Sequence, residues 1–306
     1  MLAIAGDSGT GKTTVTAGLA KALGPERITS VATDDYHRYD REERKGLPFT
    51  PLSPECNYIE IMEQHLQQLA HGQPILKPVY DHDTGKLGRP ELVEPREFVI
   101  VEGLLPLHTK AARSCFEVSV FLDPPEALRI AWKLARDTKK RGYTEDQVRE
   151  DLLKREPESV RFIRPQRAYA DIVVRFAPIE ERGETADDPL SATLLLRPTI
   201  DHPELHKILG DDTSQAMHLE LSRDDDGKPV DAVHIYADAV RDITRKVEQA
   251  MWDEVSVDSP LPESLGRLDA DSDTRDEPLA LTQLLLLYHL VQARERLGRS
   301  AADRDG

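Results

Sequence analysis

A glycine-rich stretch near the first residue constrains this chain more than any other feature. An apolar run over residues 1–5 leads into GDSGTGKT at residues 6–13, which matches the pattern G-x-x-x-x-G-K-[ST] of loops that wrap nucleotide phosphates. Its glycines allow backbone angles closed to other residues, so successive N–H groups can turn toward an anion. The next residues, 14–23, predict a helix whose partly positive N-terminus points at the same phosphates. We therefore expect a nucleotide-binding loop between a strand and a helix.

Each position of this loop has an expected part in binding ATP and Mg2+. Lys12 places an ammonium group against the β- and γ-phosphates, and the hydroxyl of Thr13 is suited to ligate Mg2+. A chance match in a glycine-rich loop is the alternative, but the apolar Val15, Leu19 and Leu23 recur at helical spacing after it. The expected nucleotide-binding residues are Gly6, Asp7, Ser8, Gly9, Thr10, Gly11, Lys12, Thr13 and Thr14.

Charge and composition exclude several classes of partner. The chain has 306 residues, with 40 Lys and Arg against 56 Asp and Glu, for a formal net charge of −16. This balance argues against nucleic acid or an anionic membrane surface as the main partner. Two cysteines outside any CxxC suit a reducing compartment. Since no apolar run approaches about 20 residues and the chain starts on a strand, we expect a soluble cytoplasmic protein without membrane span or leader.

Alternating strand and helix patterns predict an α/β fold. Candidate strands cover residues 1–5, 28–33, 98–101, 118–122 and 172–174, and candidate helices cover 14–23, 58–70, 125–140 and 144–155. Such alternation is typical of a P-loop NTPase-like, mostly parallel sheet with helices on both faces. Short strands at 193–196, 217–221 and 232–236, separated by turn-rich segments, predict an antiparallel C-terminal addition.

The predicted domain organisation follows these patterns. We expect a kinase core with acceptor loop and lid over 1–190, antiparallel strands and a helix continuing it over 191–254, an acidic linker over 255–277, a C-terminal helix over 278–297 and a tail over 298–306. The leucine-rich final helix needs a partner surface. Packing on its own domain and contact with a second copy are both open.

Three predicted strands end next to polar residues that suit phosphoryl transfer. Gly6, Asp34 and Glu102 follow strands whose carboxyl ends should meet at one crevice. Asp34 opens the sequence DDYHRYDR, residues 34–41. Transfer of a phosphoryl group to an alcohol needs a carboxylate near the acceptor hydroxyl, and cations hold any anion that the acceptor carries. A solvated loop with surface ion pairs is the alternative.

A basic cluster on a predicted helix is the second candidate anion site. Lys133, Arg136 and Lys140 are spaced so that one helix face can present three cations, and Lys139 and Arg141 lie beside them. An ordinary solvated basic helix is the alternative. His82 could contact a substrate, but it could equally be an ordinary loop histidine held by hydrogen bonds.

Six segments, taken in order, carry a resemblance to a known family. GDSGTGKTT, TDDYHRYDR, KPVYDHDTGKL, IVEGLLPLH, AWKLARDTKKRGYT and FIRPQRAYADIVV together resemble the phosphoribulokinase and uridine kinase family over residues 1–177, and its phosphoribulokinase branch more closely. The resemblance implies an ATP-dependent kinase that phosphorylates ribulose 5-phosphate to the bisphosphate used in carbon fixation. It also implies a homodimer.

The resemblance also implies roles for single residues. Asp34 is similar to the family's catalytic base, and Glu102 to the acidic residue that works with the metal held by Thr13. On the substrate side it implies His37, Arg41 and His82. Lys133, Arg136, Asp137 and Arg141 match the stretch flanking the transferred phosphoryl group, with Arg136 and Arg141 as the charge stabilisers.

Two departures from the family pattern affect these expectations. Residues 53–57 read SPECN where the family has an Asp-Pro-Arg-Ala-Asn-type stretch, so one cation near the sugar is missing. Thr10 stands where plant-type enzymes have a regulatory cysteine, which excludes that thiol switch.

Two other functions stay open. A uridine or cytidine kinase-like enzyme would need more aromatic stacking than an aromatic content of 5% suggests. A nucleotide-binding regulator without turnover would be expected to lack Asp34 or Glu102.

Overall fold

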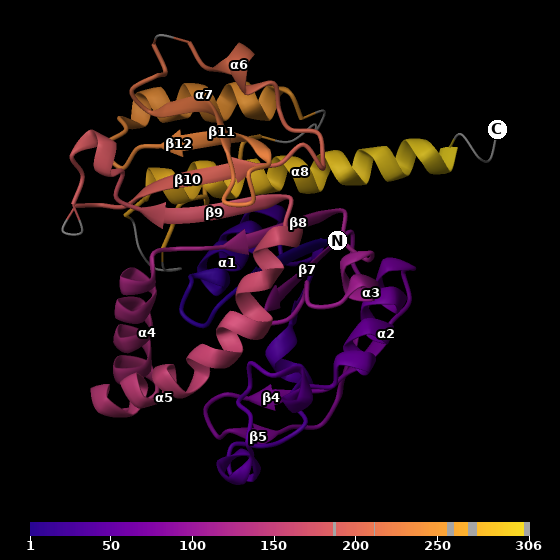
Figure 1. The fold of residues 1–306 in the computed structure, drawn as a ribbon. Coiled ribbons are helices and arrows are strands. Elements are labelled where there is room, and N and C mark those ends of the chain that lie inside the picture. The colour runs from indigo at the N-terminus through magenta and orange to yellow at the C-terminus, as the bar shows by residue number, and fades with distance from the viewer. Residues whose placement is uncertain (186–187, 211, 256–259, 269–273, 303–306) are drawn as a thin grey trace. The chain divides into compact units, whose positions relative to one another are not determined.

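The computed structural model describes residues 1–185, 188–210, 212–255, 260–268 and 274–302 (Figure 1). Contacts between residues divide the chain into two compact units. The first unit comprises residues 1–12 and 26–170, and the second comprises 13–25 and 171–306. In this division the helix after the phosphate loop groups with the second unit. The predicted domain boundaries stay a prediction.

The first unit is built on a parallel sheet with the strand order β8-β1-β7-β2. The strands are β1 (Leu2–Gly6), β2 (Ile28–Ala32), β7 (Phe98–Gly103) and β8 (Val118–Leu122). Every residue of β1 and β8 is buried, which explains why these strands read as continuous apolar runs. The structure confirms the predicted strands of this region.

Helices of the first unit cover one part of this sheet and carry the basic cluster. Helix α2 (Ile59–Ala70) buries Ile59, Met62, Leu66 and Leu69 in an apolar cluster with residues of β2 and β7. The short α3 (Lys110–Arg113) contacts α2. Helices α4 (Glu126–Lys140) and α5 (Glu145–Glu158) contact each other (Figure 1).

The end of α5 departs from regular helix geometry. Thr144 caps its start through a capping box with Gln147, as the sequence S/T-x-x-E/Q favours. Pro157 lies inside its last turn, and the π-turn η4 (Ser159–Ile163) and the 3-10 segment η5 (Arg164–Tyr169) follow directly. A proline removes one backbone donor from the helical ladder, so a change of helix type at this point is expected.

Residues 33–56, here called the acceptor loop, contain three short 3-10 turns: η1 (Thr33–Tyr36), η2 (Glu43–Gly46) and η3 (Pro54–Cys56). Two small antiparallel pairs follow it. These are β3 (Ile75–Lys77) with β6 (Glu91–Val93), and β4 (Tyr80–Asp81) with β5 (Lys86–Leu87). The predicted turn at 83–85 joins β4 to β5, and Gly85 there has a φ of 73°, which favours glycine.

The second unit contains the predicted antiparallel strands. Their order is β9-β10-β12-β11, with bounds β9 (Ile172–Ala177), β10 (Ser191–Leu196), β11 (Met217–Arg223) and β12 (Pro229–Ile235). The turn η6 (Glu180–Arg182) and the short α6 (Leu205–Ile208) connect them. Helix α7 (Arg241–Asp253) contacts α8 (Glu277–Ala302), which also contacts β10 and β12. This antiparallel addition is as predicted.

The long helix α8 packs on its own unit. Its leucines at 279, 281, 284, 285, 286, 287 and 290 are buried within the chain. It also approaches α1 (Lys12–Leu23), since a Cβ atom on Gly18 would lie 2.0 Å from Nε2 of Gln283. Of the two possibilities left open for this helix, packing on its own domain is therefore confirmed.

Some side chains of the second unit are buried in segments where the sequence suggests exposure to solvent. In the predicted acidic linker, residues 256–259 and 269–273 lie outside the described residues, but Leu261 and Leu265 are buried. These apolar side chains pack into the unit, so this part does not run through solvent. Val240, which precedes α7, is 56% exposed, whereas Glu248 within the helix is buried and pairs with Arg241 and Arg275.

Within the described part of the chain, no helix is both long enough and apolar enough to cross a membrane.

Candidate active site

The three strand ends singled out from the sequence lie at one edge of the first unit's sheet. Strands β1, β7 and β2 are neighbours and run parallel. Gly6 is the last residue of β1, and Glu102 is opposite Ala32 at the end of β2. Asp34 is the second residue of η1, which follows Ala32 directly. The register thus brings the phosphate loop and both candidate carboxylates to the same edge.

The phosphate loop has the backbone that the motif predicts. Gly9 and Gly11 both have a φ of 90°, a region that favours glycine. Lys12 curls back over the loop, and its Nζ donates to the carbonyl oxygens of Gly6 at 2.9 Å and Asp7 at 2.8 Å. Burial lowers the pKa of Lys12, and the nearby charges of Glu102 and Asp34 act against that lowering. Lys12 therefore interacts electrostatically with both candidate carboxylates.

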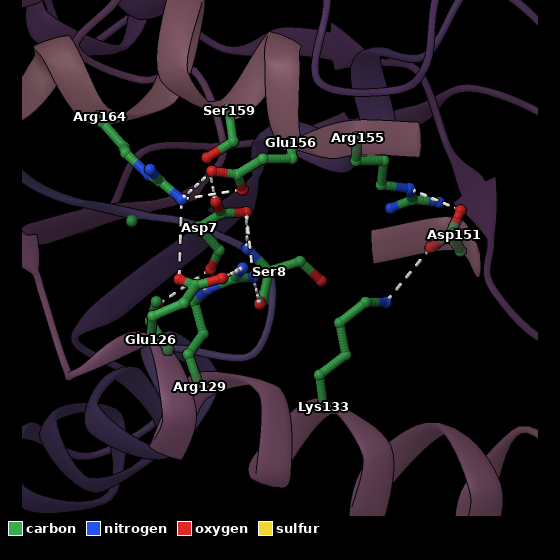
Figure 2. A network of polar contacts seen from close by, with 12 residues as sticks. Asp7, Ser8, Glu126, Arg129, Lys133, Asp151, Arg155, Glu156, Ser159 and Arg164 are labelled. Carbon is green, nitrogen blue, oxygen red and sulfur yellow. Dashed lines mark hydrogen bonds and ion pairs between the residues drawn. The ribbon is translucent and has the colours of Figure 1, made fainter. Parts of the chain in front are cut away.

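Two loop side chains are used inside the protein. Thr10 is buried, and its Oγ1 donates to the carbonyl oxygen of Asp7 at 3.0 Å. The buried Asp7 carboxylate accepts hydrogen bonds from the Ser8 amide at 2.6 Å and from the hydroxyl of Ser159 (Figure 2). The side chains of Asp7 and Thr10 therefore hold the shape of the loop through contacts with its own backbone.

Helix α4 packs against this loop with one face. Nη1 of Arg129 donates to the carbonyl oxygen of Ser8 at 3.0 Å, and Nη2 of Arg136 to the Ser8 hydroxyl at 3.3 Å. A Cβ atom on Gly9 would lie 2.9 Å from Cβ of Lys133, so only glycine allows this approach. Arg129 was missed from the sequence, although it continues the helical spacing of Lys133 and Arg136 by one turn.

Asp137 organises the predicted cationic cluster. Its carboxylate accepts from Nζ of Lys133 at 2.7 Å and from Nε of Arg136 at 2.8 Å, and Nη1 of Arg141 lies 3.6 Å away. Burial raises the pKa of Asp137, but hydrogen bonds from Arg136 and Lys133 outweigh it and bring the pKa to about 2. Each oxygen of the Asp137 carboxylate is thus bound to a cation of the same helix, and Asp137 anchors these cations.

The cations of this cluster differ in exposure. Lys133 is 3% exposed and lies 3.5 Å from Asp151 as well as beside Asp137 (Figure 2). It does not present its ammonium group to solvent as the predicted helix face would, because the carboxylates enclose it. The side chains of Arg136 and Arg141 are each 34% exposed. The side chain of residue 140 lies outside the described part.

Asp34 is held among positive and titratable groups. Its side chain is 32% exposed, and its Oδ2 lies 3.6 Å from Nε2 of His82. Burial raises the pKa of Asp34, but His37, His82, Lys12 and Arg155 outweigh burial, so the net pKa is lowered. The carboxylate thus stays ionised at neutral pH and is able to accept a proton. Arg155 on α5 is a second residue that sequence reasoning missed.

Aromatic and imidazole rings surround Asp34. Tyr80 makes edge contacts with His37 at 4.8 Å and with His82 at 5.1 Å between ring centroids. His37 is 3% exposed, and its Nδ1 lies 2.7 Å from Oδ1 of Asn57. Burial lowers the pKa of both histidines. His37 is thus a buried part of the site, whereas His82 is exposed beside the carboxylate.

The arginines of the acceptor loop are partly engaged by the chain itself. Arg41 donates to the carbonyl oxygens of His82 and Asp83, the latter at 3.5 Å, and packs against Gly85. Arg44 was missed from the sequence, although it continues the three-residue spacing of Arg38 and Arg41. Its guanidinium lies 4.9 Å from the centroid of the Tyr80 ring. Arg41 and Arg44 therefore contact His82 and Tyr80, two residues of the cluster around Asp34.

The donor set suits a metal carried in by a nucleotide. Among the described residues no group of three or more His, Cys, Asp or Glu side chains is arranged to hold a metal ion. Mg2+ commonly takes one or two protein oxygens and completes its shell with phosphates and water. Thr13 in α1 and Glu102 in β7 each carry an oxygen of the kind that Mg2+ takes, and their part in binding the metal stays a prediction.

A glycine loop between a parallel strand and a helix, with carboxylates at adjacent strand ends, defines a P-loop nucleotide-binding protein. The sequence profile of the Phosphoribulokinase / Uridine kinase family matches residues 1–181. The chain belongs to this family, and the resemblance inferred from its motifs is confirmed.

Individual relatives agree with this assignment. The phosphoribulokinase of Synechocystis sp. is 39% identical over 178 residues, which cover 58% of this chain and 54% of that protein. The uridine kinase of Oceanobacillus iheyensis is 34% identical over 183 residues, covering 57% of this chain and 85% of that protein. This chain spans about half the length of the phosphoribulokinases it matches.

A solved structure shares the fold. Phosphoribulokinase from Rhodobacter spheroides matches with a TM-score of 0.59 at 17% identity, covering 83% of this chain and 96% of that chain. The likeness extends beyond the first unit and confirms the predicted α/β fold with its antiparallel addition.

Proposed function

We propose that this protein is an ATP-dependent phosphotransferase that phosphorylates the C1 hydroxyl of ribulose 5-phosphate. The observation that carries the proposal is an ionised Asp34 that lies 3.6 Å from His82 and interacts electrostatically with Lys12 of the phosphate loop. The identity to a phosphoribulokinase supports the acceptor.

In the proposed reaction, Asp34 accepts the proton of the acceptor hydroxyl as the hydroxyl oxygen attacks the γ-phosphorus of ATP. The bond between this phosphorus and the oxygen bridging to the β-phosphate breaks, and ADP leaves. Lys12, Arg136 and Arg141 stabilise the charge on the phosphoryl oxygens. His82 and Arg41 hold the acceptor, and the buried His37 shapes that side of the site. Lys133 and Asp137 act by fixing the position of Arg136.

Mg2+ bound through Thr13 and Glu102 would neutralise charge on the β- and γ-phosphates. The other steps depend on residues of the chain alone.

A panel of acceptors tests the proposal. Purified protein with ATP and Mg2+ is given ribulose 5-phosphate, other sugar phosphates, free sugars, uridine and cytidine, and ADP release is followed by a coupled assay. We expect ribulose 5-phosphate to give by far the highest kcat/KM. A higher kcat/KM for uridine would reject the assignment.

A nucleoside kinase is the second candidate, favoured by the match across most of the uridine kinase chain. A nucleoside carries no phosphate, so it has less need for loop arginines, and Tyr80 is buried between two histidines where no base can stack on it. A regulator without turnover would bind ATP but release no ADP with any acceptor. Cytoplasmic location and a homodimer stay predictions, the latter testable by sedimentation.

A further inference from the structure

The turn that ends α5 lies between the two loops of the candidate site. Pro157 is in the last turn of the helix, and the π-turn begins at Ser159. The adjacent side chains of Glu158 and Ser159 contact two different loops, more than 100 residues away in each case. No part of the proposed reaction uses either residue.

Ser159 contacts the phosphate loop. Its hydroxyl donates to Oδ2 of Asp7, and both residues are buried, at 2% and 7% exposure (Figure 2). The other oxygen of the same carboxylate accepts from the amide of Ser8 at 2.6 Å. Ser159 therefore influences the orientation of a loop amide that lies beside the expected phosphates.

Glu158 contacts the acceptor loop. Its carboxylate accepts from the backbone amide of Thr50 at 3.0 and 3.1 Å, and from the Thr50 hydroxyl. Hydrogen bonds to an ionised acceptor are stronger than neutral ones. Because Thr50 is 7% exposed, its amide would be left unsatisfied without this partner.

The contacts continue from Thr50 to the residues around Asp34. The side-chain amide of Asn57 donates to the carbonyl oxygens of Pro51 at 3.0 Å and Ser53 at 2.8 Å. Oδ1 of Asn57 lies 2.7 Å from Nδ1 of His37. A series of polar contacts, joined by short stretches of backbone, thus connects the phosphate loop with His37 and the rings beside Asp34.

We propose that Glu158 and Ser159 are positioning residues that couple nucleotide binding at the phosphate loop to the arrangement of the acceptor loop. The proposal rests on the proposed function in that the second ligand is a kinase acceptor. Binding of a nucleotide rearranges the loop that Asp7 and Ser159 hold, and the same turn carries Glu158 and its partner Thr50. Acceptor affinity therefore rises when the nucleotide is bound.

Calorimetry tests the coupling. The Kd of ribulose 5-phosphate is measured with and without a saturating non-hydrolysable ATP analogue and Mg2+, and the ratio of the two values is the coupling. For the unaltered protein we expect a ratio of about five or more. Ser159→Ala and Glu158→Gln should each bring the ratio to about one. The double variant should lose no more than either single one, because both act in one series of contacts.

Two comparisons separate positioning from loss of folding. Glu145→Gln removes an exposed carboxylate at the start of the same helix, where it pairs with Arg149, and this variant should keep the full ratio. Nucleotide affinity of Glu158→Gln without acceptor should change by less than about twofold. A ratio of one in the unaltered protein, or an unchanged ratio in Glu158→Gln, would overturn the proposal.

Hydrogen exchange tests the coupling without any acceptor. Adding Mg–ADP to the unaltered protein should slow exchange at the amides of Thr50 and Leu52, and Glu158→Gln should abolish this protection. If ribulose 5-phosphate does not bind, the proposed function is wrong. The exchange measurement uses no acceptor, so it still tests whether the two loops are coupled. Equal protection in both proteins would contradict it. Because Glu158→Gln leaves the buried Asp7–Ser159 contact in place, the test does not depend on Ser159→Ala folding.

Discussion

At the scale of single residues, two carboxylates illustrate how environment assigns a role. Asp34 is a third exposed and faces Lys12 and His82, whereas Asp137 is 3% exposed and pairs with Lys133 and Arg136. Both have a lowered pKa, but only Asp34 has a surface from which to reach an acceptor. The family resemblance predicted both carboxylates near the substrate, and the difference in burial assigns them different roles.

Replacement of Asp34 tests the base role. We expect Asp34→Asn to lower kcat by about 10²- to 10⁴-fold, the usual contribution of a general base, with the Kd of Mg–ADP changed by less than about threefold. Steady-state kinetics and calorimetry measure the two quantities. Asp40→Asn, which removes a carboxylate of the same loop paired with Lys86, is the control. Full turnover in Asp34→Asn would remove this residue from the base role.

Asp137 has a structural consequence instead. Asp137→Asn should lower the free energy of unfolding by about 3–5 kcal/mol, because it leaves the buried Lys133 without its main partner. Chemical denaturation measures the loss. The variant Asp137→Asn with Lys133→Met should regain part of it. Equal stability of Asp137→Asn and the unaltered protein would show that Asp151 suffices to pair Lys133.

At the scale of elements, the close packing of α8 on α1 depends on one small residue. The side chain of Gln283, fully buried, accepts from the amide of Gly266 at 2.8 Å and donates to the carbonyl oxygen of Thr14 at 3.4 Å. Gly18 leaves the space that this side chain occupies. Periodicity predicted both helices, but the sequence gives no sign of which helix faces which, since several apolar stripes compete for the same partners.

Gly18→Ala tests this packing. Alanine favours an isolated helix by about 1 kcal/mol over glycine, yet we expect a loss of about 1–3 kcal/mol because the new methyl displaces Gln283. Thermal unfolding without nucleotide measures the change. Gly46→Ala is the matched control, as nothing lies within 4 Å of a Cβ at that exposed position. A rise in Tm for Gly18→Ala would refute the close contact.

At the scale of the whole molecule, each unit has its own polar interior. In the first, charged side chains surround the phosphate loop. In the second, the buried His289 contacts the half-buried His202. Nδ1 of His202 lies 3.2 Å from Nε2 of His289, and Nε2 of His202 lies 2.7 Å from the carbonyl oxygen of Arg197. Burial, the neighbouring His202 and Arg296 lower the pKa of His289 to about 3.

This histidine pair predicts acid sensitivity. Below pH 6.5 the unfolded chain takes up a proton at His289 that the folded chain does not accept until about pH 3. The free energy of unfolding should therefore fall by about 1.4 kcal/mol per pH unit for this group as the pH decreases between those values, and recover above pH 6.5. Urea denaturation across this range measures the slope. His289→Gln, which keeps a donor toward His202, should flatten it, and an unchanged slope would exclude His289 as the cause.

The sequence by itself determined the local features of this protein. The GDSGTGKT loop, the continuous apolar strands and the helical periodicities each depend on neighbouring residues, so the strand–loop–helix order and the family were predictable. The convergence of Gly6, Asp34 and Glu102 was predictable too, because parallel strands end at one edge. Only the tertiary structure decided that Asp137 is an anchor and that Lys133 and His37 are buried. It also decided that Arg129, Arg44 and Arg155 join the site. The contacts of Glu158 and Ser159 with two loops at once were equally beyond the sequence. These facts depend on contacts between distant segments, and burial there sets the charge and reach of each side chain.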